Sequence, residues 1–219
     1  MKTYIYCTKP KNKSDLLIMD NDSGKYYCEG RHSGRRSITI LPFVPIECEV
    51  KEALILSPTY KDYSLNPNHC DFDDVSLVDE LAKRMGFGKY DDNSDAHEFL
   101  DNYSQGKDLY AYHLENVNPV ELHLSDFYED EDCTKPLTKA PQSYRFAYRR
   151  HDCADEEARM INKWSDQEGH ECFQDVYGWY YVEKCLIFSD HAQYCAKILN
   201  GEKDLEVRKT RIAEGVTFK

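Results

Sequence analysis

The chain has 219 residues, of which 41% are hydrophobic and 31% charged, a composition typical of one folded domain or two small ones, with a single domain the simpler interpretation. No segment approaches the roughly 18 consecutive apolar residues of a membrane span, and the N-terminus lacks the apolar core of a signal peptide, so we expect a cytoplasmic protein without membrane contact. The formal net charge of −12 opposes broad electrostatic binding to a phosphate backbone, so we expect no broad DNA binding, and any nucleic-acid partner must meet a local basic patch.

The first part of the chain predicts strands separated by polar connections. Residues 3–8 alternate and are rich in Tyr and Ile, which predicts a central strand. Residues 10–36 are polar and contain glycine, which favours a surface excursion with a short strand at residues 25–28. Strands are then predicted at residues 37–43 and 46–56, and we expect these two to pair with each other.

Two helices and several strands follow. Residues 74–86 carry apolar side chains at helical spacing and end at Gly86, and a second short helix is predicted after Asn93. In that second helix, His97 is expected to pack or to lie at the surface rather than to bind a ligand. Further strands are predicted at residues 109–114, 119–123 and 143–148.

The last part of the chain predicts a helix at residues 154–164 and an aromatic strand at residues 176–188. A helix at residues 189–199 follows, and it ends at Asn200-Gly201, where glycine can adopt the left-handed cap conformation. A charged strand at residues 204–209 comes next. Short strands with long polar connections predict an α+β fold built on a small β-barrel with flanking helices.

The strand at residues 204–209 carries more charge than a core strand usually does. Because side chains alternate along a strand, Glu206 and Arg208 are expected on one face and Lys203 on the other. If the first face lines a cleft, Arg208 offers a planar fork of donors, and Glu206 accepts from an amine or orients the arginine. A surface ion pair, which contributes roughly 0 to 1 kcal/mol, explains the same spacing.

The segment HAQYCAKILNGEKDLEVRKT resembles the opening motif of ASCH domains, in which a helix precedes a strand of the type Gly-x-Lys-x-x-Glu-x-Arg. The segment TYIYCTKPK resembles the strand that follows this motif in the family. Two further segments, at residues 109–127 and 137–149, resemble the family's late strands. The matching residues are Tyr194, Ile198, Leu199, Gly201, Lys203, Glu206, Arg208 and Lys209 in the first segment, Tyr4, Ile5, Tyr6, Cys7, Thr8 and Lys9 in the second, and His113, Ala140, Pro141, Gln142 and Ser143 in the late strands.

The order of these segments differs from that of the family, because ASCH domains begin with the motif at which this chain ends. Joining residue 219 to residue 2 restores the family's order, so we expect a circularly permuted PUA-like domain. A truncated tandem repeat is the alternative, although its first copy would lack the opening motif. Permutation predicts that the strand at residues 204–209 packs in the same barrel as residues 3–8. The expected single domain spans residues 1–219, with residues 1–149 as barrel body, 150–185 as connecting segment and 186–219 as permuted opening helix and strand.

The resemblance implies a cleft for RNA or a nucleoside, and we expect no cofactor. Some ASCH-like proteins are small amidohydrolases that act on acetylated cytidine, and others are described as ribonucleases. Lys203 matches the motif lysine to which a catalytic role is assigned, and Glu206 stands where those amidohydrolases carry threonine, so these two are the candidate catalytic residues. Arg208 is the candidate for binding phosphate or carbonyl oxygens. The rest of the expected pocket is Ser143, His113, Gln142 and a stacking aromatic such as Tyr6 or Tyr112.

The nine cysteines are scattered without tight disulfide spacing, which fits a reducing compartment. Two His-x-Cys pairs could still form a tetrahedral zinc site that staples the connecting segment. Surface histidines and free cysteines are the simpler interpretation, and no metal is expected at the cleft. The four residues concerned are His151, Cys153, His170 and Cys172.

Three functions follow as hypotheses. The leading one is a domain that binds RNA or a modified nucleoside, and the second is a hydrolase that uses Lys203 on an acylated nucleoside. The third is a protein-interaction module that keeps the barrel without a ligand, for which the acidity of the chain argues. The third would be favoured if Lys203, Glu206 and Arg208 pointed into solvent on separate sides.

Overall fold

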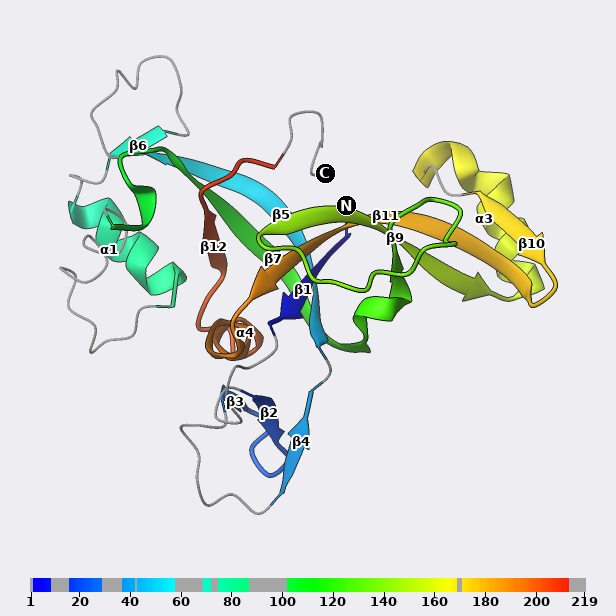
Figure 1. Ribbon diagram of the computed structural model, residues 1–219, viewed down its shortest axis with the longest axis horizontal. Coiled ribbons are helices and arrows are strands. Elements are labelled where there is room, and N and C mark those ends of the chain that lie inside the picture. Colours follow the sequence, from blue (N-terminus) through cyan, green and yellow to red (C-terminus); the bar gives the residue numbers. More distant parts are fainter. Residues whose placement is uncertain are drawn as a thin grey trace.

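The computed structural model describes residues 2–8, 16–28, 37–41, 43–57, 69–71, 75–86, 102–168 and 171–212. Within these ranges the fold is α+β and rich in strands (Figure 1). The strands are β1 (Lys2–Cys7), β2 (Leu17–Asp20), β3 (Tyr26–Cys28), β4 (Ile38–Ile40), β5 (Val44–Ser57), β6 (His69–Asp71), β7 (Leu109–Leu122), β8 (Phe127–Tyr128), β9 (Tyr144–Cys153), β10 (Cys172–Asp175), β11 (Gly178–Asp190) and β12 (Leu205–Arg208). The helices are α1 (Val75–Arg84), α3 (Asp155–Glu168) and α4 (Ala192–Leu199), with a 3₁₀ turn at Leu124–Asp126. Among the described helices, none combines the length and the apolarity that crossing a lipid bilayer requires.

The main sheet is curled, and its path through the described strands runs β12-β7-β5-β1-β11-β9-β8, with β10 joined to β11 and β6 to β5 (Figure 1). The central strands β1 and β11 are parallel, whereas β1 and β5 are antiparallel. The curl brings edge strand β12 back towards β11, and the two strands are joined by a hydrogen bond from Arg208 Nη2 to the Ser189 carbonyl at 2.8 Å. Strands β12 and β1 belong to the same sheet, as predicted for residues 204–209 and residues 3–8. The strand-rich α+β architecture also agrees with the predicted small barrel and its flanking helices.

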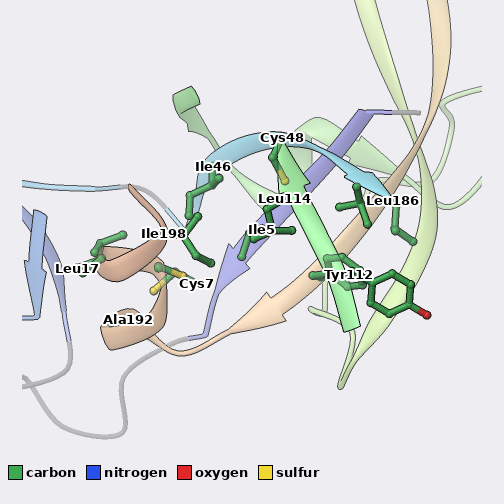
Figure 2. Packing of buried hydrophobic residues seen from close by; sticks show 14 of the residues in the cluster. Ile5, Cys7, Leu17, Ile46, Cys48, Tyr112, Leu114, Leu186, Ala192 and Ile198 are labelled. Carbon is green, nitrogen blue, oxygen red and sulfur yellow. The ribbon is translucent and has the colours of Figure 1, made fainter. Parts of the chain in front are cut away.

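Strands β1 and β11 supply side chains to two separate cores. Ile5, Cys7, Leu186 and Phe188 face one core, and Tyr4, Tyr6, Cys185 and Ile187 face the other. This alternation follows from strand geometry, and because both faces are covered, every residue of β1 after Lys2 is buried. The first core packs against α4 (Figure 2), and the second packs against Phe127 and Leu137.

Helix α4 joins the main sheet to a separate three-stranded sheet with the order β3-β2-β4. Ala192 and Ile198 of α4 belong to the first core, together with Ile5 of β1 and Ile46 of β5 (Figure 2). At the C-terminal end of α4, the Asn200 side chain accepts from the Tyr26 N–H at 2.9 Å and donates to the Tyr26 carbonyl at 2.8 Å. The Asn200 side-chain amide therefore docks the small sheet, because it bonds both backbone groups of Tyr26, as a neighbouring strand would. Gly201 follows with φ of +71°, as the predicted cap requires.

Some predicted elements differ from the structure. The expected pairing of residues 37–43 with residues 46–56 is wrong, because β4 pairs with β2 while β5 pairs with β1, β6 and β7. The two strands predicted between residues 109 and 123 are one strand, β7, in which Asn116 has φ of +50° and the register with β5 shifts nearby. The helix predicted after Asn93, with His97, lies outside the described residues apart from its end at residues 102–104.

Strands β9 and β11 extend beyond the curled, barrel-like part of the main sheet, which we call the barrel. They lead to a projection that we call the arm, whose described part comprises α3, β10 and the turn into β11 (residues 154–168 and 171–177; Figure 1). The pairing of β9 with β11 continues without interruption from Tyr144 opposite Phe188 to Cys153 opposite Trp179. Helix α3 packs on β10 and β11. The predicted connecting segment, residues 150–185, thus includes the arm and begins and ends inside continuous strands.

Candidate functional site

A pocket of about 390 Å³ opens at the carboxyl ends of the parallel strands β1 and β11. The main chains stay paired there, since Thr8 donates its N–H to the Asp190 carbonyl at 2.8 Å, and α4 begins shortly afterwards. Residues around β12 form the facing wall. The charged side chains of the lining, within the part of the chain that the structure describes, include Asp190, Lys203, Glu206 and Arg208.

Glu206 is the centre of a buried ion cluster in this wall. Its Oε2 lies 2.9 Å from Lys203 Nζ, and its Oε1 lies 2.8 Å from Arg208 Nε. The side chains of Lys203, Glu206 and Arg208 are 7%, 8% and 10% exposed. The three residues therefore meet at one pocket, and this is not the arrangement that would favour a ligand-free interaction module.

Lys203 reaches Glu206 because it lies outside the strand. Strict alternation predicted the two side chains on opposite faces, and this prediction is wrong. Strand β12 begins at Leu205, and the lysine folds back so that its Nζ donates to the Leu205 carbonyl at 2.7 Å. The same ammonium group then contacts the Glu206 carboxylate.

The end of α1 supports the turn that precedes β12. Asp204 donates its N–H to the Arg84 carbonyl at 2.9 Å, and its carboxylate lies 3.1 Å from Arg84 Nε. Gly86 follows with φ of +83°, and a Cβ at this position would come within 3.1 Å of the Lys203 Cβ. Helix α1 thus fixes the backbone from which Lys203 reaches the pocket, and a larger residue at Gly86 would displace it.

Arg208 is positioned by β11 as well as by Glu206. Its Nη2 donates to the Ser189 carbonyl at 2.8 Å, and its guanidinium carbon lies 5.2 Å from the centroid of the Phe188 ring. A guanidinium group has five N–H donors in a rigid plane. The contacts with Glu206 and Ser189 hold the guanidinium plane of Arg208, and its remaining N–H groups can donate to a ligand.

Asp190 is a pocket residue that the sequence patterns did not identify. It is the last residue of β11, 8% exposed, and its Oδ1 accepts from the His191 N–H at 2.8 Å. Within the described residues no donor faces the buried Oδ2. Burial, followed by the charge of Glu206, raises the pKa of Asp190 to about 8. A polar pair, Ser189 and Asp190, directly after an apolar strand was the available signal, but it resembles an ordinary helix start.

The pKa of Glu206 is shifted in the opposite direction. Burial acts to raise it, but the charges of Lys203 and Arg208, together with hydrogen bonds from Lys203 and Asp190, hold the pKa below its ordinary value. At neutral pH, Glu206 is therefore ionised and Asp190 is protonated. The buried wall then carries two cations and one anion, a net charge of +1 beside a neutral acid.

Two tyrosine rings flank the charged wall. Lys203 Nζ lies 5.6 Å from the centroid of Tyr194, and Lys209 Nζ lies 4.8 Å from the centroid of Tyr103. Both tyrosines line the pocket, and burial raises the pKa of Tyr103, which keeps its hydroxyl group neutral. These rings lie where the sequence predicted a stacking aromatic such as Tyr6 or Tyr112.

The other residues predicted for the pocket are placed in different ways. Gln142 is exposed and lines the pocket. Ser143 is beside the pocket through its backbone, whose carbonyl accepts from the Ser189 N–H at 3.1 Å. Tyr112 is fully buried, and its hydroxyl group accepts from the Ile212 N–H at 2.9 Å.

His113 and Tyr6 lie elsewhere. His113 stands opposite Leu205 in the sheet, where its Nδ1 lies 3.3 Å from Glu115 and its Nε2 lies 3.5 Å from Asp204. Tyr6 packs in the second core, with its ring centroid 6.2 Å from that of Phe43. Neither side chain is among the described residues that line the pocket.

The two His-x-Cys pairs are brought together only in part. The Sγ atoms of Cys153 and Cys172 lie 3.7 Å apart. His151 stacks on Tyr181, with ring centroids 4.7 Å apart, and its Nε2 lies 3.1 Å from Glu183. His170 lies outside the described residues. Among the residues that are described, no group of three or more His, Cys, Asp or Glu side chains could hold a metal ion.

Comparison of the chain with protein-family models, with curated proteins and with solved structures finds no match in any of the three. The resemblance to ASCH domains therefore stays an expectation from the sequence, and the function has to be argued from the pocket.

Proposed function

We propose that the pocket binds a nucleoside, either free or within a single strand of RNA. The observation that carries this proposal is the buried cluster of Lys203, Glu206 and Arg208, which faces a pocket flanked by two tyrosine rings. The same three residues carry the resemblance to the ASCH motif. Sequence and geometry therefore support the same surface.

The size and lining of the pocket suit a ligand of this kind. Its volume of about 390 Å³ falls within the range of about 300 to 1,000 Å³ that is common for small-molecule sites. Tyr103 and Tyr194 offer ring faces on which a base can stack. Lys203 and Arg208 offer donors for base or phosphate oxygens, and Gln142 offers both an amide donor and an amide acceptor.

The charge of the whole molecule limits the kind of nucleic acid that can bind. A net charge of −12 repels a long phosphate backbone, whereas the wall of the pocket is locally positive. We therefore expect recognition of one nucleoside or a short single-stranded segment, because single-stranded bases can be splayed out into a pocket.

Replacement of Arg208 by lysine tests this proposal. Arg208→Lys keeps the charge but loses the planar fork that joins Glu206 to Ser189, so we expect the affinity for cytidine and cytidine monophosphate to fall about tenfold or more. Isothermal titration calorimetry at pH 7 measures the effect. Arg211→Lys is the matched control, because Arg211 is exposed and outside the pocket lining. Equal affinities for the two variants, or no binding by the unmodified protein, would contradict the proposal.

A second candidate function is hydrolysis of an acylated nucleoside. The specific observation in its favour is the 2.9 Å contact between Lys203 Nζ and Glu206 in the pocket, next to the protonated Asp190. A lysine paired with a carboxylate and a neutral acid nearby are groups able to move protons.

Incubation with acetylated cytidine separates these functions, with the product followed by chromatography. Turnover that is lost in Lys203→Ala and kept in Lys184→Ala identifies a hydrolase; Lys184 is the control, because it is an exposed residue of β11 outside the pocket lining. Binding without turnover identifies a binding domain. An unmodified protein that neither binds nor turns over any of these probes supports the third hypothesis, an interaction module.

A further inference from the structure

The charged wall of the pocket is electrostatically incomplete when it is empty. Buried charges in proteins are generally paired. Lys203 and Arg208 both contact the single carboxylate of Glu206, and among the ion pairs of the described residues none includes Asp190. If Asp190 is neutral, the wall keeps one buried positive charge in excess. If Asp190 is ionised, its buried Oδ2 has no facing donor in the described structure.

Binding of an anion while Asp190 is protonated avoids both the excess positive charge and the unpaired carboxylate oxygen. An anion placed against Lys203 and Arg208 balances the excess positive charge, and a protonated Asp190, whose proton is shared with Glu206, carries no negative charge that would repel the anion. Lys203 has one N–H beyond those that contact Leu205 and Glu206, and Arg208 has donors beyond those that contact Glu206 and Ser189.

We propose that the pocket selects anionic ligands, such as the phosphate of a nucleotide, and that Asp190 is the residue that makes their binding depend on a proton. This inference rests on the proposed function in one respect, because it takes the ligand to be a nucleotide rather than an uncharged nucleoside. The residue is a specificity determinant and contributes no chemical step.

The pH dependence has a definite sign. Burial and the neighbouring Glu206 raise the pKa of Asp190 to about 8, so the carboxyl group is neutral below that pH and the wall is positive. Above it, Asp190 becomes a second anion and the excess positive charge disappears. Anion affinity is therefore highest below pH 8 and should fall by up to about tenfold per pH unit above it, because one proton is linked to binding.

The other titratable groups around Asp190 come from three sides. Lys203, Glu206 and Arg208 face it from β12 and the preceding turn, and Tyr103 faces it across the pocket. The buried Cys195 of α4 is also close, and its pKa is raised, first by a hydrogen bond with Cys7. His191, at the start of α4, lines the pocket next to Asp190.

The experiment is calorimetric titration with sulfate, cytidine monophosphate and cytidine between pH 7.5 and 9.5. Sulfate stays a dianion throughout, so any change in its affinity belongs to the protein. Asp190→Asn keeps the shape and a donor but cannot ionise, and we expect its affinity for sulfate to vary less than about twofold over this range. Glu202→Gln is the control, because it removes an exposed charge close in sequence to Lys203 and should leave the pH profile unchanged. Proton uptake, measured in buffers of different ionisation enthalpy, gives a second readout on the unmodified protein that needs no variant.

The outcomes separate this inference from the proposed function. Sulfate binding with the expected pH profile, without binding of either cytidine compound, supports the anion site and overturns the nucleoside proposal. Cytidine bound as tightly as its monophosphate at every pH supports the nucleoside proposal and overturns the inference. A flat profile for the unmodified protein, or the same fall in Asp190→Asn, also overturns it.

Discussion

Glu206 lies between two cationic side chains in a region from which most solvent is excluded. The loss of hydration that three buried charges suffer is large, and the attraction between them offsets it only where the geometry is good. A buried ion cluster is therefore weak evidence of a role in stability. Its position at the wall of a pocket, at the end of the central strands, is better explained by ligand binding.

Removal of the central carboxylate is expected to be costly. Glu206→Gln leaves Lys203 and Arg208 buried without their counter-ion, and we expect the free energy of unfolding at pH 7 to fall by about 3 kcal/mol. This is the low end of the range for broken buried pairs, because Asp190 can ionise and replace part of the lost charge. Urea denaturation measures the change.

The matched control is an exposed pair with similar chemistry. Glu129 lies 3.4 Å from Arg145, and its side chain is 49% exposed. Glu129→Gln should alter the free energy of unfolding by less than about 1 kcal/mol. If the two glutamine variants were equally stable, the cluster around Glu206 would be solvated in solution and the electrostatic argument for the pocket would fail.

Helix α4 connects three parts of the molecule, since it follows β11, packs on the first core and carries the small sheet at its end. The two hydrogen bonds between Asn200 and the Tyr26 backbone dock that sheet. The sequence predicted the helix end at Asn200-Gly201, but a cap pattern contains no information about what the asparagine side chain contacts. The docking arises from the tertiary structure.

Asn200→Ala should loosen the small sheet without unfolding the barrel. The Tyr26 N–H and carbonyl lose their partners, and we expect the opening free energy of strands β2 and β3 to fall by about 1 to 3 kcal/mol. Amide hydrogen exchange, read at Tyr26 and at the strands of the main sheet, measures this. Asn118→Ala is the control, because Asn118 is exposed and its side chain donates locally, to the Asn116 carbonyl. Equal loss of protection in both sheets would mean that the small sheet is not a separate unit of stability.

At the scale of the whole molecule, the arm is an extension of a hairpin that the barrel already contains. Strands β9 and β11 pair continuously up to it, and α3 packs on β10 of the arm and on β11. The pocket lies at the opposite end of β11, at Ser189 and Asp190. This separation is consistent with an addition to the barrel, and it allows a direct test.

Replacement of residues 154–178 by Asn-Gly should leave the barrel and the pocket intact. Cys153 and Trp179 are directly opposite each other, and a two-residue type I′ turn can close a hairpin at such a pair. We expect a folded protein whose affinity for cytidine monophosphate lies within about threefold of the unmodified protein, as judged by circular dichroism and calorimetry. An unfolded product would show that the arm belongs to the folding unit of the barrel.

The sequence by itself determined the local elements and the chemistry of one segment. Periodicity predicted β1, α1, α4 and β12 close to their observed bounds, because alternation and helical spacing follow from which residues are buried locally. The charged residues Lys203, Glu206 and Arg208 were identified because such charges are uncommon in a barrel strand and match a motif.

The tertiary structure decided which of these elements meet. The curl of the sheet brings β12 back to β11. Arg208 therefore contacts Ser189, and Glu206 lies close enough to Asp190 for its charge to raise the pKa of Asp190. No local pattern contains this information, because the two segments are separated by α4 and their contact depends on the path of the whole sheet. The raised pKa of Asp190 is likewise a property of burial and of neighbours far along the chain, so only the folded structure could reveal it.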